Sequence, residues 1–222
     1  MSPRPAAILF DLDGTLIDSA RSILAALRGA FETVGATPAL ALTPAIIGPP
    51  LRHTLRNLAG RDDPALLDAL AAAFREVYDE TGYRQTEVYA GVPQMLSRLH
   101  SEGISLHIVT NKRIAPTQRI LTHLGWTEWF TGIYALDALT PPAPHKPSLV
   151  ATVLERERLV RETTWMVGDS GEDRRSAEGN ALRFWAASWG YGTEAASTTA
   201  ASDDVLRAPA ELLEHAGLKI AH

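Results

Sequence analysis

Short apolar runs alternate with amphipathic segments over the second half of the chain, and this alternation constrains the fold more than any other feature. The runs have the length of strands and cover residues 104–109, 132–136, 164–167, 183–187 and 204–206. The segments between and beside them have helical spacing and cover residues 92–102, 115–124, 147–157, 173–181 and 209–215. This order predicts an α/β fold, a Rossmann-like doubly wound parallel sheet with helices on both faces.

The first part of the chain has a different pattern. Residues 6–10 (Ala-Ala-Ile-Leu-Phe) are an apolar run that ends abruptly in a polar segment, which is typical of a buried parallel strand. No strand pattern follows between residues 18 and 83, where apolar residues recur at helical spacing over 23–34, 51–58 and 63–77. An all-helical insert therefore follows the first predicted strand.

Two predicted domains result from this change of pattern. The Rossmann-like core comprises residues 1–17 and 90–222, and the inserted helical cap domain comprises residues 18–89. We expect the cap to be attached by two hinges, near residues 16–19 and 87–93. A cap on two hinges can close over the core and exclude water from the space between them.

Composition limits the partners of the chain. Its 222 residues include 26 acidic and 21 basic ones, a formal charge of -5, so we expect no nucleic-acid partner. Cysteine is absent, which excludes disulfides, thiolate metal sites and cysteine nucleophiles. No run reaches the roughly 18 apolar residues of a membrane span. We therefore expect no membrane association and a cytoplasmic location, whereas no feature of the sequence indicates an oligomeric state.

Polar side chains follow the predicted strands where ligands bind in doubly wound sheets, outside the carboxyl ends. These side chains belong to Asp11, Asp13, Thr110, Lys146, Asp169 and Asp173. Several carboxylates placed together repel one another unless a cation lies between them, and carboxylate oxygens suit Mg²⁺. A lysine and a threonine beside such an ion would bind phosphate oxygens, so the pattern indicates phosphoryl transfer.

Four segments in this order carry a family resemblance. They are Asp11-Leu12-Asp13-Gly14-Thr15-Leu16, Thr110 at the end of an apolar run, Lys146-Pro147, and Gly168-Asp169-Ser170-Gly171-Glu172-Asp173. Together they resemble the motifs of the haloacid dehalogenase-like hydrolase superfamily over most of the chain. Thr110-Asn111-Lys112, Trp189-Gly190-Tyr191-Gly192 and the helical insert are similar to its phosphoglycolate phosphatase-like branch.

The resemblance implies a role for each residue. Asp11 would attack phosphorus and form an aspartyl-phosphate, and Asp13 would act as general acid and base. Thr110, Asn111 and Lys146 would bind the phosphate. Mg²⁺ would be held by Asp11, the backbone carbonyl of Asp13, Asp169 and Asp173.

Lysine usage supports the assignment of Lys146. The chain has 18 arginines and three lysines, Lys112, Lys146 and Lys219, so a lysine that is kept indicates a need for a compact charge. Lys112 is predicted with equal weight to be a functional or a solvated loop residue.

In the cap, Arg52 and Arg56 share one helix face in a stretch without acids. Either could bind a second anionic group of the substrate, although a solvated basic face is the favoured interpretation.

The substrate is predicted to be a small phosphorylated metabolite, with 2-phosphoglycolate as the leading choice. A pyrophosphatase and a sugar-phosphate phosphatase or phosphomutase of the same superfamily remain alternatives. A cap without lysine disfavours the Schiff-base chemistry of phosphonate-cleaving relatives. Two alternatives from other classes also remain, a serine esterase that uses Ser170 and a non-catalytic phosphate-binding protein.

Overall fold

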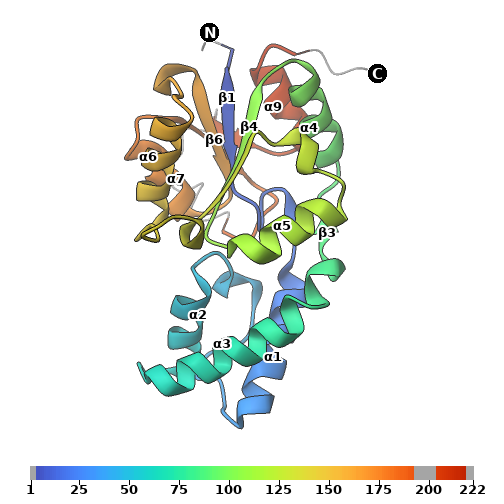
Figure 1. Ribbon diagram of the computed structural model, residues 1–222. Coiled ribbons are helices and arrows are strands. Elements are labelled where there is room, and N and C mark those ends of the chain that lie inside the picture. The colour runs from blue at the N-terminus through green and yellow to red at the C-terminus, as the bar shows by residue number, and fades with distance from the viewer. Residues whose placement is uncertain (1–3, 193–203, 219–222) are drawn as a thin grey trace.

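A parallel sheet forms the centre of the computed structural model, which describes residues 4–192 and 204–218 (Figure 1). In the described part of the chain the sheet has six strands in the order β5-β4-β1-β6-β7-β8. Their bounds are β1 Ala7–Phe10, β4 Ser105–Thr110, β5 Gly132–Ala135, β6 Thr164–Gly168, β7 Arg183–Ala187 and β8 Val205–Leu206. The chain leaves β1 in one direction and returns on its other side, which confirms the predicted doubly wound α/β class.

Helices cover both faces of this sheet because the side chains of each strand alternate between them. Ile8 and Phe10 of β1 belong to one buried hydrophobic cluster, and Leu9 belongs to a second on the opposite face. The first cluster packs against α4 (Val92–Ser101), α5 (Ile114–His123) and α9 (Pro209–His215). The second packs against α6 (Lys146–Arg156) and α7 (Gly171–Glu178).

The insert after the first strand is helical, as the sequence predicts. It contains α1 (Ala20–Val34), α2 (Leu51–Ala59) and α3 (Pro64–Tyr78), which share a hydrophobic cluster of their own. In Figure 1 these helices lie beyond the end of the sheet at which β1 and β4 terminate. Asp63 caps α3 by accepting a hydrogen bond from the Leu66 amide, with Pro64 in the first turn. The insert therefore lies at the carboxyl ends of the strands.

A two-stranded antiparallel sheet, which the sequence did not predict, joins the insert to the core. It pairs β2 (Ile17–Asp18) with β3 (Glu87–Val88), and both strands lie in the segments predicted as hinges. Strands of two residues are too short to show the period-two alternation by which strands are recognised. The two chain crossings between core and insert are thus tied to each other by backbone hydrogen bonds.

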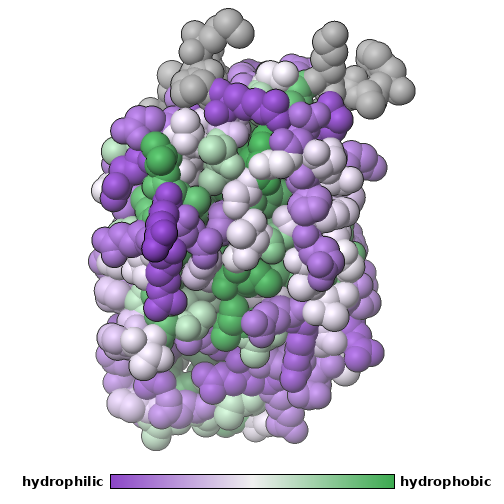
Figure 2. Space-filling model, turned by 45° about the horizontal axis from the view of Figure 1, so that its top comes forward, coloured by the Kyte–Doolittle hydropathy of each residue, from purple (hydrophilic) through white to green (hydrophobic). Residues whose placement is uncertain are grey.

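Short 3-10 helices complete the described structure: η1 Pro44–Ile46, η2 Gly82–Gln85, η3 Thr127–Trp129, η4 Leu136–Ala138 and η5 Arg161–Thr163. Hydrophilic residues cover much of the face in Figure 2, and hydrophobic residues form narrow bands between them. Within residues 4–192 and 204–218, no helix has the length and apolar character needed to cross a membrane. Lys219 lies outside the described residues.

Candidate active site

The three central strands end beside one another, and each end delivers a predicted site residue. β1 pairs with both β4 and β6 in parallel, which brings Asp11, Thr110 and Asp169 to the same edge of the sheet. All three side chains are buried. The parallel register therefore assembles residues that are far apart in the sequence.

Three buried carboxylates form a candidate metal site. One oxygen from each of Asp11, Asp169 and Asp173 lies within 4.8 Å of the other two. Burial, the charge of Asp173 and the charge of Asp169 raise the pKa of Asp11 to about 8 against the opposing effect of Lys146. Burial and the charge of Asp173 raise the pKa of Asp169 to about 6. The neighbouring carboxylates thus destabilise the charged forms of Asp11 and Asp169, and a cation would relieve this effect.

Lys146 lies within this cluster as the first residue of α6. Its Nζ is 2.5 Å from Asp11 Oδ1 and 2.5 Å from Asp173 Oδ1. Burial lowers the pKa of Lys146, but the charges of Asp11 and Asp173 outweigh this effect and hold the pKa above its usual value. Three carboxylates and one ammonium have a formal charge of -2, which matches a divalent cation. The set of hard oxygen donors therefore fits Mg²⁺.

A glycine-rich loop holds Asp169 in place. The amides of Tyr191 and Gly192 donate to Asp169 Oδ2 over 2.7 and 3.0 Å. A Cβ atom on Gly190 would lie 2.2 Å from the carbonyl oxygen of Gly14 and 2.5 Å from Asp169 Oδ2. Only glycine fits at this position, because any side chain would collide with the backbone that borders the carboxylates.

Asp173 is oriented by the start of α7. Ser170 Oγ accepts from the Asp173 amide over 3.2 Å and the Ser170 amide donates to Asp173 Oδ2 over 3.0 Å, which makes a capping box. Ser170 Oγ also donates to Asp173 Oδ2 over 2.6 Å. This geometry leaves Asp173 Oδ1 for Lys146. The Ser170 hydroxyl thus bonds a carboxylate as part of a helix cap and lacks the arrangement of an activated esterase nucleophile.

Asp13 lies between the core and the insert. Its Oδ1 accepts hydrogen bonds from Ser19 Oγ and from Lys112 Nζ, the latter over 3.1 Å. Lys112 Nζ also lies 3.0 Å from Asp13 Oδ2 and 4.6 Å from the ring centre of Tyr78 in α3. The structure therefore brings Lys112 into the site, and its rarity as a lysine is the signal in the sequence that favours this role.

Thr110 and Asn111 occupy different positions. Thr110 Oγ1 accepts a hydrogen bond from the Lys112 amide over 3.1 Å, so its O–H remains available as a donor. Asn111 Nδ2 donates to the Gly48 carbonyl of the insert and to Glu172 of the core, over 2.9 and 2.7 Å. Thr110 thus brings an available O–H donor to the cavity wall, whereas Asn111 connects the two parts of the chain.

A cavity lies above Asp11 and Asp13, between the sheet edge and the insert. The volume open to the centre of a water molecule is about 80 Å³. Thr110, Lys112 and Arg113 line it from the core. The insert contributes mainly apolar side chains to its wall, among them Ile23, Leu27, Ile46, Leu51 and Phe74.

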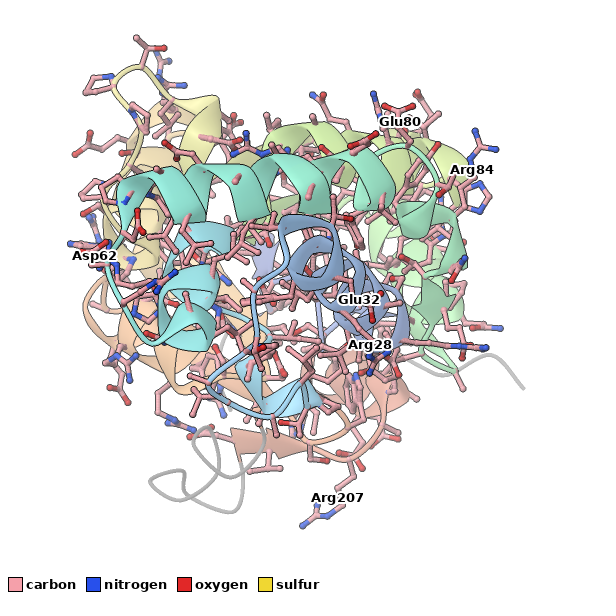
Figure 3. All side chains as sticks on the ribbon, turned by 90° about the horizontal axis from the view of Figure 1, so that it is seen from below. Arg28, Glu32, Asp62, Glu80, Arg84 and Arg207 are labelled. Carbon is pink, nitrogen blue, oxygen red and sulfur yellow. The ribbon has the colours of Figure 1, made fainter. Side chains whose placement is uncertain are left out.

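Arg52 and Arg56, the residues for which a substrate contact was the less favoured interpretation, do not line this cavity. Arg52 pairs with Asp68, and Arg56 pairs with Asp62 over 3.3 Å. Both arginines are exposed. Asp62 is at the outer edge of the insert when the molecule is viewed from below (Figure 3). The buried face of α2 instead carries Leu55 and Leu58, so its arginines point to solvent.

Tyr191 is a residue whose contacts the sequence did not predict. Its hydroxyl accepts from the Ser19 and Ala20 amides over 2.7 and 3.0 Å and donates to Asp18 over 2.7 Å. It therefore caps α1 in place of the Ser19 side chain, which is directed to Asp13. No local pattern could reveal a cap supplied from the far end of the chain.

Comparison with known proteins identifies relatives of this chain. The chain is 32% identical over 189 residues to "Tyrosine-protein kinase PtkA" of Mycobacterium tuberculosis, with 85% of this chain and 64% of that protein covered. The solved structure of PtkA superposes with a TM-score of 0.78 at 30% identity and covers 97% of this chain and 99% of that chain. The chain thus spans less than two thirds of the length of this curated relative.

Two further relatives match a similar share of this chain. A "5'-nucleotidase" of Pseudomonas aeruginosa is 31% identical, with 84% of each chain covered. A "Phosphoglycolate phosphatase" of Xanthomonas campestris is 34% identical, with 84% of this chain and 85% of that protein covered. The family described as haloacid dehalogenase-like hydrolase matches residues 8–187. The chain belongs to the haloacid dehalogenase-like hydrolase family.

Proposed function

We propose that the chain is a Mg²⁺-dependent phosphomonoesterase that transfers the phosphoryl group of its substrate to Asp11. The observation that carries the proposal is the position of Asp11. Its carboxylate contacts Lys146, belongs to the cluster with Asp169 and Asp173, and borders the cavity. A nucleophile, a fixed positive charge and a cation site thus meet at one wall of a small cavity.

The remaining residues support a two-step reaction. An Asp11 oxygen attacks phosphorus while Asp13 protonates the departing oxygen, and Asp13 then takes a proton from the water that hydrolyses the aspartyl-phosphate. Lys146 and the Thr110 hydroxyl would hold the phosphate oxygens. Asp11, Asp169, Asp173 and the Asp13 carbonyl would hold Mg²⁺, which supplies positive charge for the phosphate when bound.

The cavity supports a small substrate. Its volume of about 80 Å³ is a few times the roughly 30 Å³ that one water molecule occupies in the liquid, which suits a leaving group of a few atoms. We propose 2-phosphoglycolate as the leading substrate, in agreement with the name of the Xanthomonas relative. Pyrophosphate and sugar phosphates belong in the same assay panel.

The division into core and cap also belongs to this proposal. We assign residues 1–17 and 90–222 to the core and residues 18–89 to the cap. The antiparallel pair β2–β3 at the two crossings supports the boundaries, and Asn111 and Arg113 of the core bond the cap at Gly48 and Asp79. The cytoplasmic location and the lack of a nucleic-acid partner stay predictions from the sequence.

Hydrolysis of p-nitrophenyl phosphate and of a panel of phosphorylated metabolites, with Mg²⁺ and with EDTA, tests the proposal. The expected result is release of phosphate that requires Mg²⁺ and stops on chelation. Turnover that persists in EDTA would favour an esterase, and the lack of any turnover would favour a binding protein. Transfer of phosphate from ATP to a tyrosine peptide is assayed in parallel, because the name of one relative is a tyrosine kinase.

A further inference from the structure

The cavity contains polar groups that the chemistry at phosphorus does not use. The ammonium of Lys112 lies 3.1 and 3.0 Å from the two oxygens of Asp13 and 4.6 Å from the centre of the Tyr78 ring. Both Lys112 and Tyr78 line the cavity, one from the core and one from the insert. A cation and a phenol thus flank the residue that would protonate the leaving group.

The Tyr78 hydroxyl is buried and unsatisfied. The residue is 1% exposed, and its hydroxyl lies near Lys112 and Thr86 without a well-formed hydrogen bond in the described part of the chain. Because no acceptor among the described residues takes a well-formed hydrogen bond from this hydroxyl, it can donate to an acceptor atom of a ligand in the cavity.

The Lys112 ammonium has donor capacity left. It has three N–H donors; the two oxygens of Asp13 lie within hydrogen-bond distance, and the Tyr78 hydroxyl is a further polar neighbour. Apolar side chains such as Leu27 and Phe74 form much of the surrounding wall. In such surroundings a charge-assisted hydrogen bond is stronger than in water.

We propose that Lys112 and Tyr78 form the binding site for the leaving group and select a small leaving group that ends in a carboxylate. This inference rests on the proposed phosphomonoesterase function and specifies its substrate class. In 2-phosphoglycolate a single methylene separates the ester oxygen from the carboxylate. A carboxylate that close to the oxygen protonated by Asp13 is within reach of a cation that itself contacts Asp13.

Two other polar residues in the cavity wall serve other purposes. Arg113 pairs with Asp79 of the insert, which takes no part in the reaction and keeps the charge of Arg113 balanced. The partner of Lys112 is instead Asp13, which carries a proton when it acts as the general acid. Asn111 Oδ1 is buried without a partner, but it is an acceptor and would favour a hydroxyl over a carboxylate. A leaving group with a hydroxyl is therefore the direct competitor of the proposed carboxylate.

Three substrates of similar size decide between these leaving groups: 2-phosphoglycolate, 2-hydroxyethyl phosphate and ethyl phosphate. With wild-type protein and Mg²⁺, kcat/KM for 2-phosphoglycolate is expected to exceed both others by roughly 10- to 100-fold, the value of a charge-assisted hydrogen bond. Equal values for the three, or a preference for 2-hydroxyethyl phosphate, would overturn the inference and leave the proposed phosphomonoesterase intact. If the protein hydrolyses neither p-nitrophenyl phosphate nor any of the phosphorylated metabolites, the proposed function itself fails.

For the variant Lys112→Met, the measured quantity is the ratio of kcat/KM for 2-phosphoglycolate to kcat/KM for ethyl phosphate. Any loss caused by a displaced Asp13 affects both substrates and cancels in the ratio. The ratio is expected to fall by roughly 10-fold or more, since the variant removes the cation. An unchanged ratio would show that Lys112 only positions Asp13, which contradicts the proposed site.

Tyr78→Phe keeps the ring and removes only the unsatisfied hydroxyl, so it tests the site even if Lys112→Met folds poorly. The same ratio is expected to fall by roughly 3- to 10-fold. Arg56→Met is the matched control, because Arg56 is an exposed cap cation outside the cavity. Its ratio should equal that of the wild type, and an equal fall in Arg56→Met and Lys112→Met would contradict the proposal.

Discussion

Lys146 Nζ lies 2.5 Å from Asp11 Oδ1, inside a cluster in which both side chains are buried. This contact joins the first residue of α6 to the residue that follows β1, 135 positions earlier in the chain. The same ammonium contacts Asp173, so a single lysine joins two carboxylates. The site therefore depends on Lys146 both for its stability and for its proposed chemistry.

Replacing Lys146 with Met is expected to destabilise the protein and to abolish most activity. Breaking a buried ion pair by removing one partner costs roughly 3–5 kcal/mol. Loss of a group that stabilises the transition state lowers kcat by roughly 10²- to 10³-fold. Urea unfolding and initial rates measure the two effects. Lys146→Arg is the control for charge alone, and retention of wild-type kcat in Lys146→Met would contradict the assigned role.

The pKa of Asp11 predicts how stability of the metal-free protein depends on pH. Folding raises this pKa from 3.8 to about 8, mainly through burial. Between these values the folded protein keeps a proton that the unfolded chain has lost, so this group makes the free energy of unfolding fall as pH rises. Below pH 3.8 both states are protonated, and the contribution no longer changes.

Asp11→Asn isolates that contribution, because asparagine stays neutral. In EDTA, the variant should become progressively more stable relative to the wild type between pH 5 and pH 8, as urea unfolding would show. A stability difference that is constant over this range, or that changes in the opposite direction, would contradict the effect of burial on Asp11.

Gly190→Ala is expected to weaken both folding and metal binding. The added methyl group would lie 2.2 Å from the Gly14 carbonyl, and overpacking of this kind costs roughly 1–3 kcal/mol. Mg²⁺ titration calorimetry and thermal unfolding measure the two losses. Gly29→Ala is the matched control, since a Cβ in that α1 position meets nothing within 4 Å. It should raise stability by roughly 0.5–1 kcal/mol, and equal effects of the two variants would refute the steric argument.

Arg52→Ala and Arg56→Ala are expected to leave KM for 2-phosphoglycolate unchanged. Both arginines pair with exposed acids outside the cavity, and such exposed pairs contribute about 0–1 kcal/mol to stability. Steady-state kinetics of the two variants provide the measurement. A rise in KM of roughly tenfold in either variant would return that arginine to the substrate site.

The sequence was sufficient to predict the sheet and the residues at its edge. Apolar runs that end in Asp11, Thr110 and Asp169 correspond to β1, β4 and β6, because buried parallel strands have a continuous apolar pattern. Parallel pairing then forces their carboxyl ends together. The core of the site follows from this local pattern and one topological rule.

Contacts across the boundary between core and insert were not predictable in the same way. Arg52 and Arg56 share a helix face, but the spacing of residues does not tell which face the helix buries until its neighbours are known. The contacts of Lys112 with Asp13 and of Tyr191 with Asp18 each join segments that are far apart in the sequence. Such pairs depend on how the two parts close, which periodicity does not encode.

The turnover of 2-phosphoglycolate by Asp11→Asn in saturating Mg²⁺ tests the central claim most directly. The substitution keeps the size of the side chain but removes the attacking carboxylate. If Asp11 receives the phosphoryl group, kcat falls by at least roughly 10⁴-fold, as for the loss of other catalytic nucleophiles, while the protein stays folded. A variant that keeps kcat within roughly tenfold of the wild type would contradict an aspartyl-phosphate at Asp11.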